Sequence, residues 1–283
     1  MTDRTRFSRI LAGTDGSERA HEAVRQGARL ASMLGGSLDV VFVMDTNRAH
    51  DRDVEDAAGD VLRRAAAVAA EQGVTAATRV LAGDAADALA EEVGSHGADL
   101  LCVGPDAGVL GGAIKIGQVA AHVLRHAPCS VLLAREAGPA FPTRIACGVD
   151  GSAGSTVTAS VAASLAAAAG ADLHVLHVVP VFRGRDAEWT LGPDEPSPPE
   201  LEPSVAAAQA LGVTPIRDMA MGRPEHALVA VAKRDGVDLL VVGHRDDGGV
   251  GRALLGSVSE YCALHAPCSV LVARMGMSGK PSG

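Results

Sequence analysis

Aromatic side chains are scarce in this sequence. Phe, Trp and Tyr make up 2% of the 283 residues, with one Trp and one Tyr among them. Hydrophobic residues nevertheless make up 47%, so the protein's cores must be built from small and branched aliphatic side chains. A chain of this length exceeds one average domain, and two domains of about 140 residues each are expected.

Positive charge is also scarce. The net charge is −9 and the sequence has no cluster of basic residues. A surface that binds nucleic acid or an anionic membrane needs such a cluster, so we expect neither partner. The longest run of small residues, 160–170, is shorter than a membrane span, and the N-terminus has no apolar run long enough for a secretory signal. We therefore expect a soluble, cytoplasmic protein.

Motifs of redox, metal and nucleotide-hydrolysing enzymes are absent. The five cysteines include no C-x-x-C pair, which favours free thiols in a reducing compartment. The sequence has no G-x-x-x-x-G-K-[ST] loop, no strand-linked G-x-G-x-x-G and no H-E-x-x-H. Ser152 follows Asp150 closely but has no general base placed by the sequence, so we expect a turn or helix cap there. His174 and His177 do not share one face of a regular strand, and we expect neither a metal site nor a catalytic site.

One unit is written twice along the chain. HAPCSVLLAR at 126–135 returns as HAPCSVLVAR at 265–274, an offset of 139 residues with a single change. The other landmarks that return in the same order are Asp15-Gly16-Ser17 as Asp150-Gly151-Ser152, LLCVG at 100–104 as LLVVG at 239–243, and Gly117 as Gly256. We therefore predict two copies of one domain, 1–138 and 142–276, joined by a Gly- and Pro-containing linker.

Strands and helices alternate within each copy. Strands alternating with helices predict parallel sheets with helices on both faces, and the nearly continuous apolar character of the strands agrees. The expected strands are 9–13, 37–44, 77–81, 99–103 and 130–134 in the first copy, and 144–148, 172–179, 215–220, 238–242 and 269–273 in the second. The expected helices are 17–34, 53–72, 84–95 and 118–125, then 154–169, 203–211, 224–234 and 258–265.

The second copy departs from the first between Val181 and Pro203. Prolines crowd this segment, which also contains Trp189. Since proline interrupts regular structure, we expect an irregular surface loop, with a lid over a ligand as the alternative.

The candidate ligand site lies where strands end. In an open parallel sheet, ligands bind at the carboxyl ends of the strands. In the second copy, Asp150 closes the first strand, residues 177–180 end the second, and a Gly-rich loop from Gly243 to the Gly256-Ser257 pair leads into a helix. The Asp can accept from a ribose hydroxyl, the second strand can pair with adenine, and the helix N-terminus can hold phosphate.

At these residues the chain resembles a tandem universal stress protein, over almost the whole of both copies. The nucleotide signature of that family is Gly, two residues, Gly, nine residues, then Gly followed by Ser or Thr. Gly243 and Gly256-Ser257 fit its ends, whereas the inner glycine position holds Asp246.

The resemblance implies a fold, a ligand and partners. The fold would be α/β, two open five-stranded parallel-sheet sandwiches of adenine-nucleotide α-hydrolase-like type, packed as a pseudo-dimer through strands 130–134 and 269–273. The ligand would be ATP, ADP or AMP, with or without Mg²⁺, bound by a regulatory protein of the stress response that also forms a homodimer. The implied site residues are Asp150, Val178, Gly243, Arg245, Gly249, Gly256, Ser257 and Val258 in the second copy, and Asp15, Val43, Gly104 and Gly117 in the first.

Two carboxylates complicate the second site. Asp246 and its neighbour Asp247 would repel a triphosphate by roughly 4 kcal/mol at about 4 Å and an effective dielectric constant near 20. The side chains can instead point to solvent, a Mg²⁺ can bridge them to the phosphates, or the ligand can carry fewer phosphates. We predict that Asp246→Gly tightens triphosphate binding.

The first copy keeps the signature less well. Ala107 stands at the inner glycine position, Gln118 replaces the final Ser, and Pro105 removes a backbone donor. We therefore favour the second copy as the nucleotide site. A structural or partner-binding protein without nucleotide, and a weak ATPase, stay open as alternatives.

Overall fold

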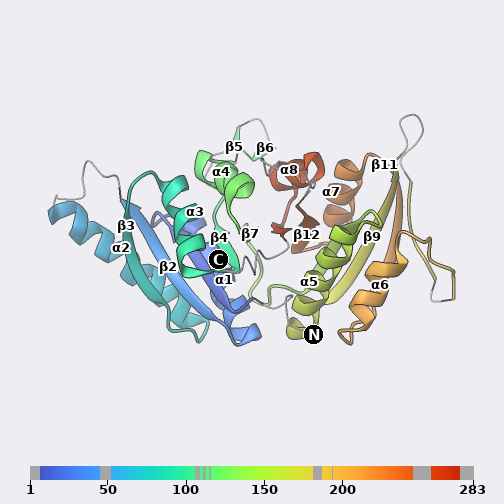
Figure 1. The fold of residues 1–283 in the computed structure, drawn as a ribbon, viewed down its shortest axis with the longest axis horizontal. Helices are drawn as coiled ribbons and strands as arrows, with labels where there is room; N and C mark the ends of the chain where they lie inside the picture. The colour runs from blue at the N-terminus through green and yellow to red at the C-terminus, as the bar shows by residue number, and fades with distance from the viewer. Residues whose placement is uncertain are drawn as a thin grey trace, which may run out of the picture. The chain divides into compact units, whose positions relative to one another are not determined.

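The computed structural model describes residues 7–44, 52–105, 109–110, 113–114, 116–180, 187–192, 194–244 and 256–274. The chain forms two compact units: the first copy, residues 7–136 together with Arg274, and the second copy, residues 137–273. Each copy has its own sheet and its own helices (Figure 1), as the alternation of strands and helices predicts. No helix in these described ranges is both long and apolar enough to cross a membrane.

The sheet of the first copy is parallel and has its switch point at the first strand. Strand β1 pairs with β2 on one side and β4 on the other, so that the order is β3-β2-β1-β4-β7. The crevice above β1 and β4 is therefore where a ligand is expected. The strands are β1 Arg9–Thr14, β2 Ser37–Met44, β3 Ala77–Ala82, β4 Leu100–Val103 and β7 Ser130–Leu133.

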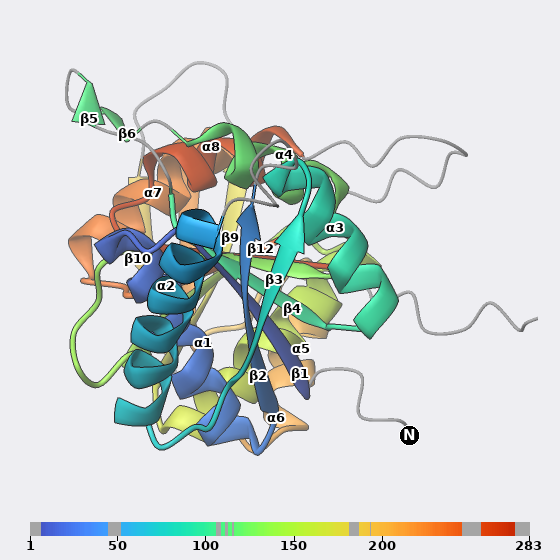
Figure 2. The same ribbon diagram turned by 90° about the vertical axis from the view of Figure 1, so that its left-hand side faces the viewer.

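Helices cover both faces of this sheet. The helices are α1 Glu18–Leu34, α2 Arg52–Glu71, α3 Ala85–His96 and α4 Gln118–His126. Helices α1 and α2 lie on one face, and α3 and α4 on the other (Figure 2). Every residue of β4 and β7 is buried between them. A short antiparallel hairpin, β5 Val109–Leu110 with β6 Ala113–Ile114, stands between β4 and α4.

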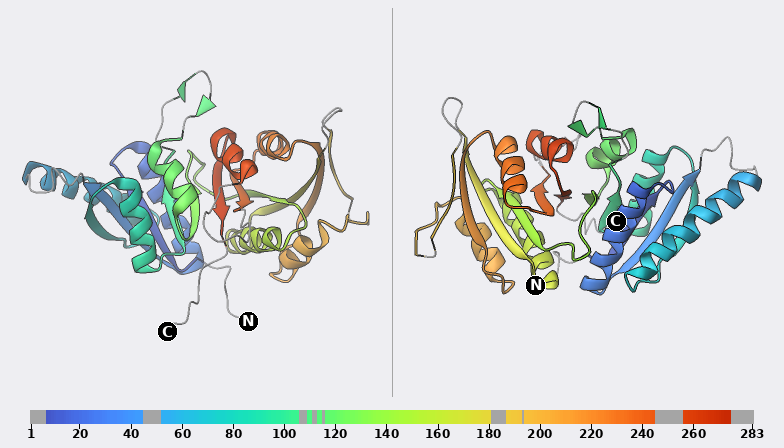
Figure 3. Two further views of the ribbon diagram at one scale, coloured as in Figure 1. Left: turned by 45° about the horizontal axis from the view of Figure 1, so that its top comes forward. Right: turned by 180° about the vertical axis from the view of Figure 1, so that it is seen from behind.

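The second copy repeats this plan. Its strands are β8 Arg144–Val149, β9 Asp172–Pro180, β11 Ile216–Gly222, β12 Leu239–Gly243 and β13 Ser269–Ala273. Its helices are α5 Ala153–Ala169, α6 Glu202–Gln209, α7 Pro224–Arg234 and α8 Ser257–His265. Helices α5 and α6 lie on one face of the sheet and α7 and α8 on the other (Figure 3).

The prediction of an irregular loop after Val181 is wrong in part. Strand β10, Ala187–Thr190, pairs antiparallel with the outer strand β11. Over the described residues of the second copy the strand order is therefore β10-β11-β9-β8-β12-β13, with β10 at the edge in addition to the five predicted strands. The prolines of this segment flank β10 and none lies inside it, so each residue of the strand keeps its backbone N–H group.

Each copy fixes the start of its first strand in the same way. The Asp99 carboxylate, just before β4, accepts from the Ser8 backbone N–H at 2.8 Å and from the Ser8 hydroxyl at 2.9 Å. Asp238, just before β12, accepts from the corresponding groups of Thr143, both at 2.7 Å. A carboxylate therefore ties the central strand to its neighbour in each copy.

All five cysteines are buried and free. Burial raises the pKa of Cys129, Cys147 and Cys262 to about 12, and it also raises the pKa of Cys102. Since the thiolate is the reactive form, these side chains act as small hydrophobic residues of the core.

Candidate functional site

An aspartate and a serine shape the turn between the first strand and the first helix of each copy. Asp15 Oδ1 accepts from the Ser17 backbone N–H at 2.9 Å, and Ser17 Oγ accepts from the Ala20 N–H at 3.2 Å. Gly16 between them has a φ of +82°, a conformation that glycine adopts without strain. The turn leaves the Asp15 side chain exposed at the carboxyl end of β1.

The second copy builds the same turn. Asp150 Oδ1 accepts from the Ser152 N–H at 3.0 Å, and Ser152 Oγ accepts from the Ser155 N–H at 3.2 Å. Ser152 is the N-cap of α5, which confirms the expected turn and cap. Partial burial alone would raise the pKa of the Asp150 carboxyl, but hydrogen bonds from Ser152 and Ser155 outweigh it and hold the pKa below its usual value.

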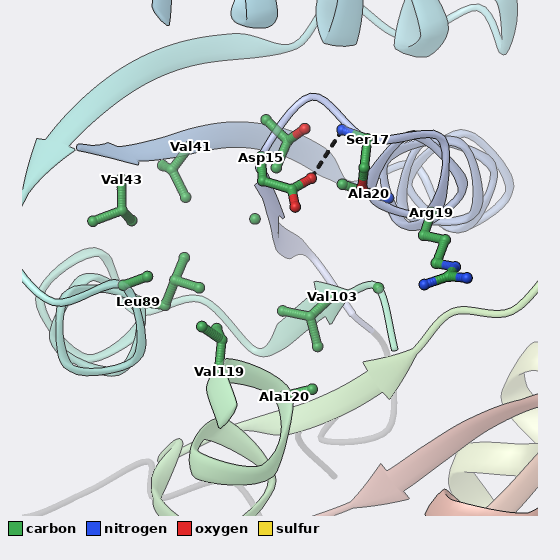
Figure 4. Close-up of a pocket in the computed structure, with 14 residues that line it drawn as sticks. Asp15, Ser17, Arg19, Ala20, Val41, Val43, Leu89, Val103, Val119 and Ala120 are labelled. Carbon is green, nitrogen blue, oxygen red and sulfur yellow. Dashed lines mark hydrogen bonds between the residues drawn. The ribbon is translucent and has the colours of Figure 1, made fainter. Parts of the chain in front are cut away.

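In the first copy, a cavity of about 100 Å³ opens beside the turn formed by Asp15 and Ser17. It lies at the switch point, between the ends of β1 and β4. The residues that line it include Asp15, Ser17 and Arg19 from the first turn and helix, Val41 and Val43 from β2, Leu89 from α3, Val103 and Gly104 from the end of β4, and Val119 and Ala120 from α4. Figure 4 shows Val41, Val43 and Leu89 on one side of the cavity, Arg19 on the other, and Asp15 between them.

Gly104 is required where β4 ends. A Cβ atom at this position would lie 2.9 Å from the carbonyl oxygen of Arg19 and 3.1 Å from its carbonyl carbon. Real Cβ atoms do not approach backbone atoms so closely, because the contact is repulsive. The glycine therefore allows the first turn of α1 to lie directly against the end of β4.

Helix α4 begins at a glycine without a side-chain cap. Gly117 is its N-cap, and no side chain accepts from the first backbone N–H groups of the helix. Elsewhere in this copy side chains do cap: Ser17 caps α1, and Asp84 of α3 accepts from the N–H groups of Ala86 and Asp87. An uncapped N-terminus keeps its N–H groups and its positive dipole end available to an anion.

The second copy has the corresponding parts. Gly243 ends β12, and a Cβ there would lie 2.8 Å from Thr158 Oγ1. The backbone oxygen of Gly243 accepts from the Ser259 hydroxyl at 2.6 Å. Helix α8 begins at Gly256, again without a side-chain cap, so that Ser257 and Val258 are its first two residues. Val178 is buried on β9 and pairs with Ala220 of β11.

Several predicted residues lie outside the described residues. In the second copy these are Arg245, Asp246, Asp247 and Gly249, and in the first copy Ala107. Of the first-copy residues that were predicted, Asp15, Val43 and Gly104 line one cavity. Gly117 lies next to it, since its N–H donates to the Pro105 oxygen at 3.1 Å.

Sequence reasoning did not find Arg19, Val41, Leu89 or Val119, which also line the cavity. Val41 could have been found, because residues two apart on a strand point to the same side and Val43 was predicted. Arg19, Leu89 and Val119 come from three different helices, and the sequence holds no signal that brings those helices together.

The buried histidines of β9 have protein partners. His174 Nδ1 lies 2.7 Å from Asp218 Oδ2, and His177 Nδ1 lies 3.1 Å from the Val149 backbone oxygen. Within the described ranges, no three His, Cys, Asp or Glu side chains are grouped so as to hold a metal ion.

Comparison with known proteins gives consistent matches over both copies. The sequence model described as the universal stress protein family matches residues 6–135 and again residues 142–274. A universal stress protein of Mycobacterium tuberculosis is 29% identical over 300 residues, covering 94% of this chain and 96% of that protein. One from Thermus aquaticus is 36% identical over 133 residues, covering 44% of this chain and 93% of its own length. Among solved structures, a universal stress protein from Archaeoglobus fulgidus DSM 4304 has a TM-score of 0.74 at 20% identity, covering 95% of this chain and 98% of that one.

Proposed function

Because the chain belongs to the universal stress protein family and carries two of its units in tandem, we propose that it is a regulatory module of the stress response that binds an adenine nucleotide. The nucleotide is ATP, ADP or AMP, and it binds at the carboxyl ends of the strands. The observation that carries the proposal is the first-copy cavity, in which an apolar wall, an exposed carboxylate and the start of an uncapped helix come together.

The lining of this cavity fits the three parts of such a ligand. Val41, Val43 and Leu89 form an apolar wall of the kind on which a purine base packs (Figure 4). The Asp15 carboxylate, held by Ser17, keeps acceptor capacity for ribose hydroxyls. The N–H groups at the start of α4 are suited to phosphate oxygens. Adenine, ribose and phosphate would follow one another across the cavity.

We propose the same role for the second copy. Asp150, Val178, Gly243 and the Gly256-Ser257 start of α8 stand at the corresponding ends of its strands. The Ser257 hydroxyl adds a donor that Gln118 of the first copy does not reproduce at the same length. Arg245 and Gly249 complete the proposed set, and Mg²⁺ would enter only as a partner of bound phosphates.

Calorimetric titration tests this function. ATP, ADP and AMP are titrated into the chain with and without Mg²⁺, and then into Asp15→Asn, Asp150→Asn and the double variant. Asparagine keeps the oxygen that accepts from the serine N–H, so the turn persists while the charge is lost. We expect each single variant to weaken one site by about tenfold or more, as for a hydrogen bond to a charged group.

A matched control is Asp56→Asn, on an exposed position of α2, which should leave binding unchanged. Absence of heat and of any thermal shift with all three nucleotides would reject the proposal in favour of a partner-binding protein without nucleotide. Phosphate release from ATP that persists in Ser257→Ala would likewise argue against hydrolysis at this site.

We further propose that each chain consists of two domains, 1–138 and 142–276, and that two such chains form a homodimer in the cytoplasm. The free, buried thiols support a reducing compartment. Size-exclusion chromatography with light scattering should give twice the monomer mass of 28.6 kDa, and a monomer at all concentrations would remove the dimer from the proposal.

A further inference from the structure

Arg19 occupies a special place in the first-copy cavity. It is the second residue of α1, and its side chain lines the cavity on the side away from Val41, Val43 and Leu89 (Figure 4). Among the described residues that line the cavity, Arg19 supplies the positive charge and Asp15 the negative charge. The cavity is therefore polarised, with an apolar wall at one side and a guanidinium at the other.

The backbone holds Arg19 in this position. Its carbonyl group lies so close to Gly104 that a Cβ there would be 2.9 Å from the carbonyl oxygen. Next along the chain, the Pro105 oxygen accepts from Gly117, where α4 begins. The close contact thus places the first turn of α1 beside the end of β4, and both Arg19 and the first turn of α4 line the same cavity.

The corresponding position of the second copy has no side chain. Ser17 and Ser152 are the N-caps of α1 and α5, and both helices are 17 residues long. Counting from these caps, Arg19 corresponds to Gly154. The two copies therefore share the aspartate, the capping serine and the glycine-started helix, whereas two residues after the capping serine the first copy has the cation of Arg19 and the second copy has Gly154.

We infer that Arg19 binds the phosphates of the nucleotide and makes the first copy select ADP and ATP over AMP and adenosine, a step that rests on the proposed function. A guanidinium donates charge-assisted hydrogen bonds to phosphate oxygens in a forked geometry. It offsets the loss of the Ser hydroxyl that Gln118 replaces at the start of α4. The N–H group that Pro105 lacks is not a phosphate donor in the second copy either, because the corresponding His244 N–H donates to the Ala273 oxygen at 2.9 Å. At the position corresponding to Arg19 the second copy has Gly154, so this particular contribution to selection by phosphate number is missing there.

Calorimetry on the full chain tests the inference, with adenosine, AMP, ADP and ATP as probes. Asp150→Asn is included as a background that weakens the second copy. In Arg19→Gln, the affinity for ADP and ATP should fall about five- to tenfold, because a charge-assisted hydrogen bond is lost whose strength solvent partly screens. The affinity for adenosine, which has no phosphate, should change less than about twofold. Arg19→Lys should restore part of the loss, because it returns the charge without the fork.

Two further variants sharpen the result. Arg125→Gln, an exposed arginine in the last turn of α4, is the matched control and should bind all four probes as the native chain does. Gly154→Arg moves the cation to the second copy, where a Cβ meets only Ser152 Oγ at 3.7 Å, an ordinary contact. This variant should increase ATP affinity at the second site and leave its adenosine affinity unchanged.

The titrations separate phosphate binding by Arg19 from a merely structural role and from the proposed function itself. Unchanged ATP affinity in Arg19→Gln overturns the inference and leaves nucleotide binding standing. An equal loss for all four probes also overturns it, because Arg19 would then support only the shape of the cavity. Failure of the native chain to bind any probe overturns the proposed function and the inference together.

Discussion

Replacing the glycine at the end of β4 or β12 by alanine should destabilise the two copies for different reasons. In Gly104→Ala, the new Cβ would lie 2.9 Å from the Arg19 carbonyl oxygen, so either α1 or the end of β4 must move. In Gly243→Ala, the Cβ would lie 2.8 Å from Thr158 Oγ1, which is a side-chain atom. Extra atoms in a packed interior cost about 1–3 kcal/mol, and we expect both variants to fall in this range.

A second substitution distinguishes the backbone contact at Gly104 from the side-chain contact at Gly243. Thr158→Ala deletes the atom that the new Cβ meets, so Gly243→Ala with Thr158→Ala should be more stable than the sum of the single changes, by about 1 kcal/mol. No such rescue is available at Gly104, because its obstacle is backbone. Thr156→Ala, on the same helix and without this contact, is the control and should combine additively with Gly243→Ala.

Differential scanning calorimetry measures these effects. A loss of about 1–3 kcal/mol corresponds to a decrease of about 3–10 °C in the melting temperature of the affected copy. Gly104→Ala should also weaken nucleotide binding, because the start of α1 carries both Ser17 and Arg19. The packing argument would be refuted if Gly104→Ala melted at the same temperature as the native chain. It would also be refuted if the losses of stability in Gly243→Ala and Thr158→Ala simply added up in the double variant.

Three other properties can be checked directly. The five buried thiols should not react with a thiol reagent at about pH 8 in the native chain and should all react after unfolding, because burial keeps the reagent away and because Cys129, Cys147 and Cys262, with a pKa of about 12, are almost entirely protonated at that pH; fast native labelling would contradict the burial. Asp99→Ala and Asp238→Ala should each lower the free energy of unfolding by about 1–2 kcal/mol, measured by urea denaturation, because each leaves a strand start without its acceptor. Since the pKa of Asp150 is lowered on folding, its carboxylate stabilises the protein above about pH 4 and loses this effect as the pH falls through the native pKa. Asp150→Asn should therefore reduce the melting temperature at about pH 7, and this deficit should shrink as the pH is lowered below about 4; a deficit that does not change with pH would contradict this account.

Most of the fold can be predicted from the internal repeat and from the pattern of apolar residues. Two near-identical segments at 126–135 and 265–274 revealed the two copies, and the alternation of apolar runs with helices located the strands and the helices of both sheets. These features are local, since a strand of a doubly covered sheet is apolar along its whole length. The N-caps Ser17 and Ser152 were likewise readable, because a cap is a contact between residues three apart.

Contacts between distant residues could not be predicted in this way. Strand β10 forms because β11 offers an unpaired edge, and nothing within residues 187–190 outweighs the prolines around them. Arg19 lines the cavity because Gly104 admits the first turn of α1, a contact across more than eighty residues of sequence. The cavity of the first copy is likewise formed by segments that are distant in sequence, since α1, α3 and α4 come together at the ends of β1 and β4. The preference for the second copy, which rests on its more complete signature, stays a prediction.

A crystal structure of the chain grown with ATP tests the central claim most directly. The account predicts electron density in the first-copy cavity, with adenine against Val41 and Val43, ribose at Asp15, and phosphates between Arg19 and the start of α4. Density for ATP only at other surfaces, or an unchanged cavity at saturating ATP, would contradict it.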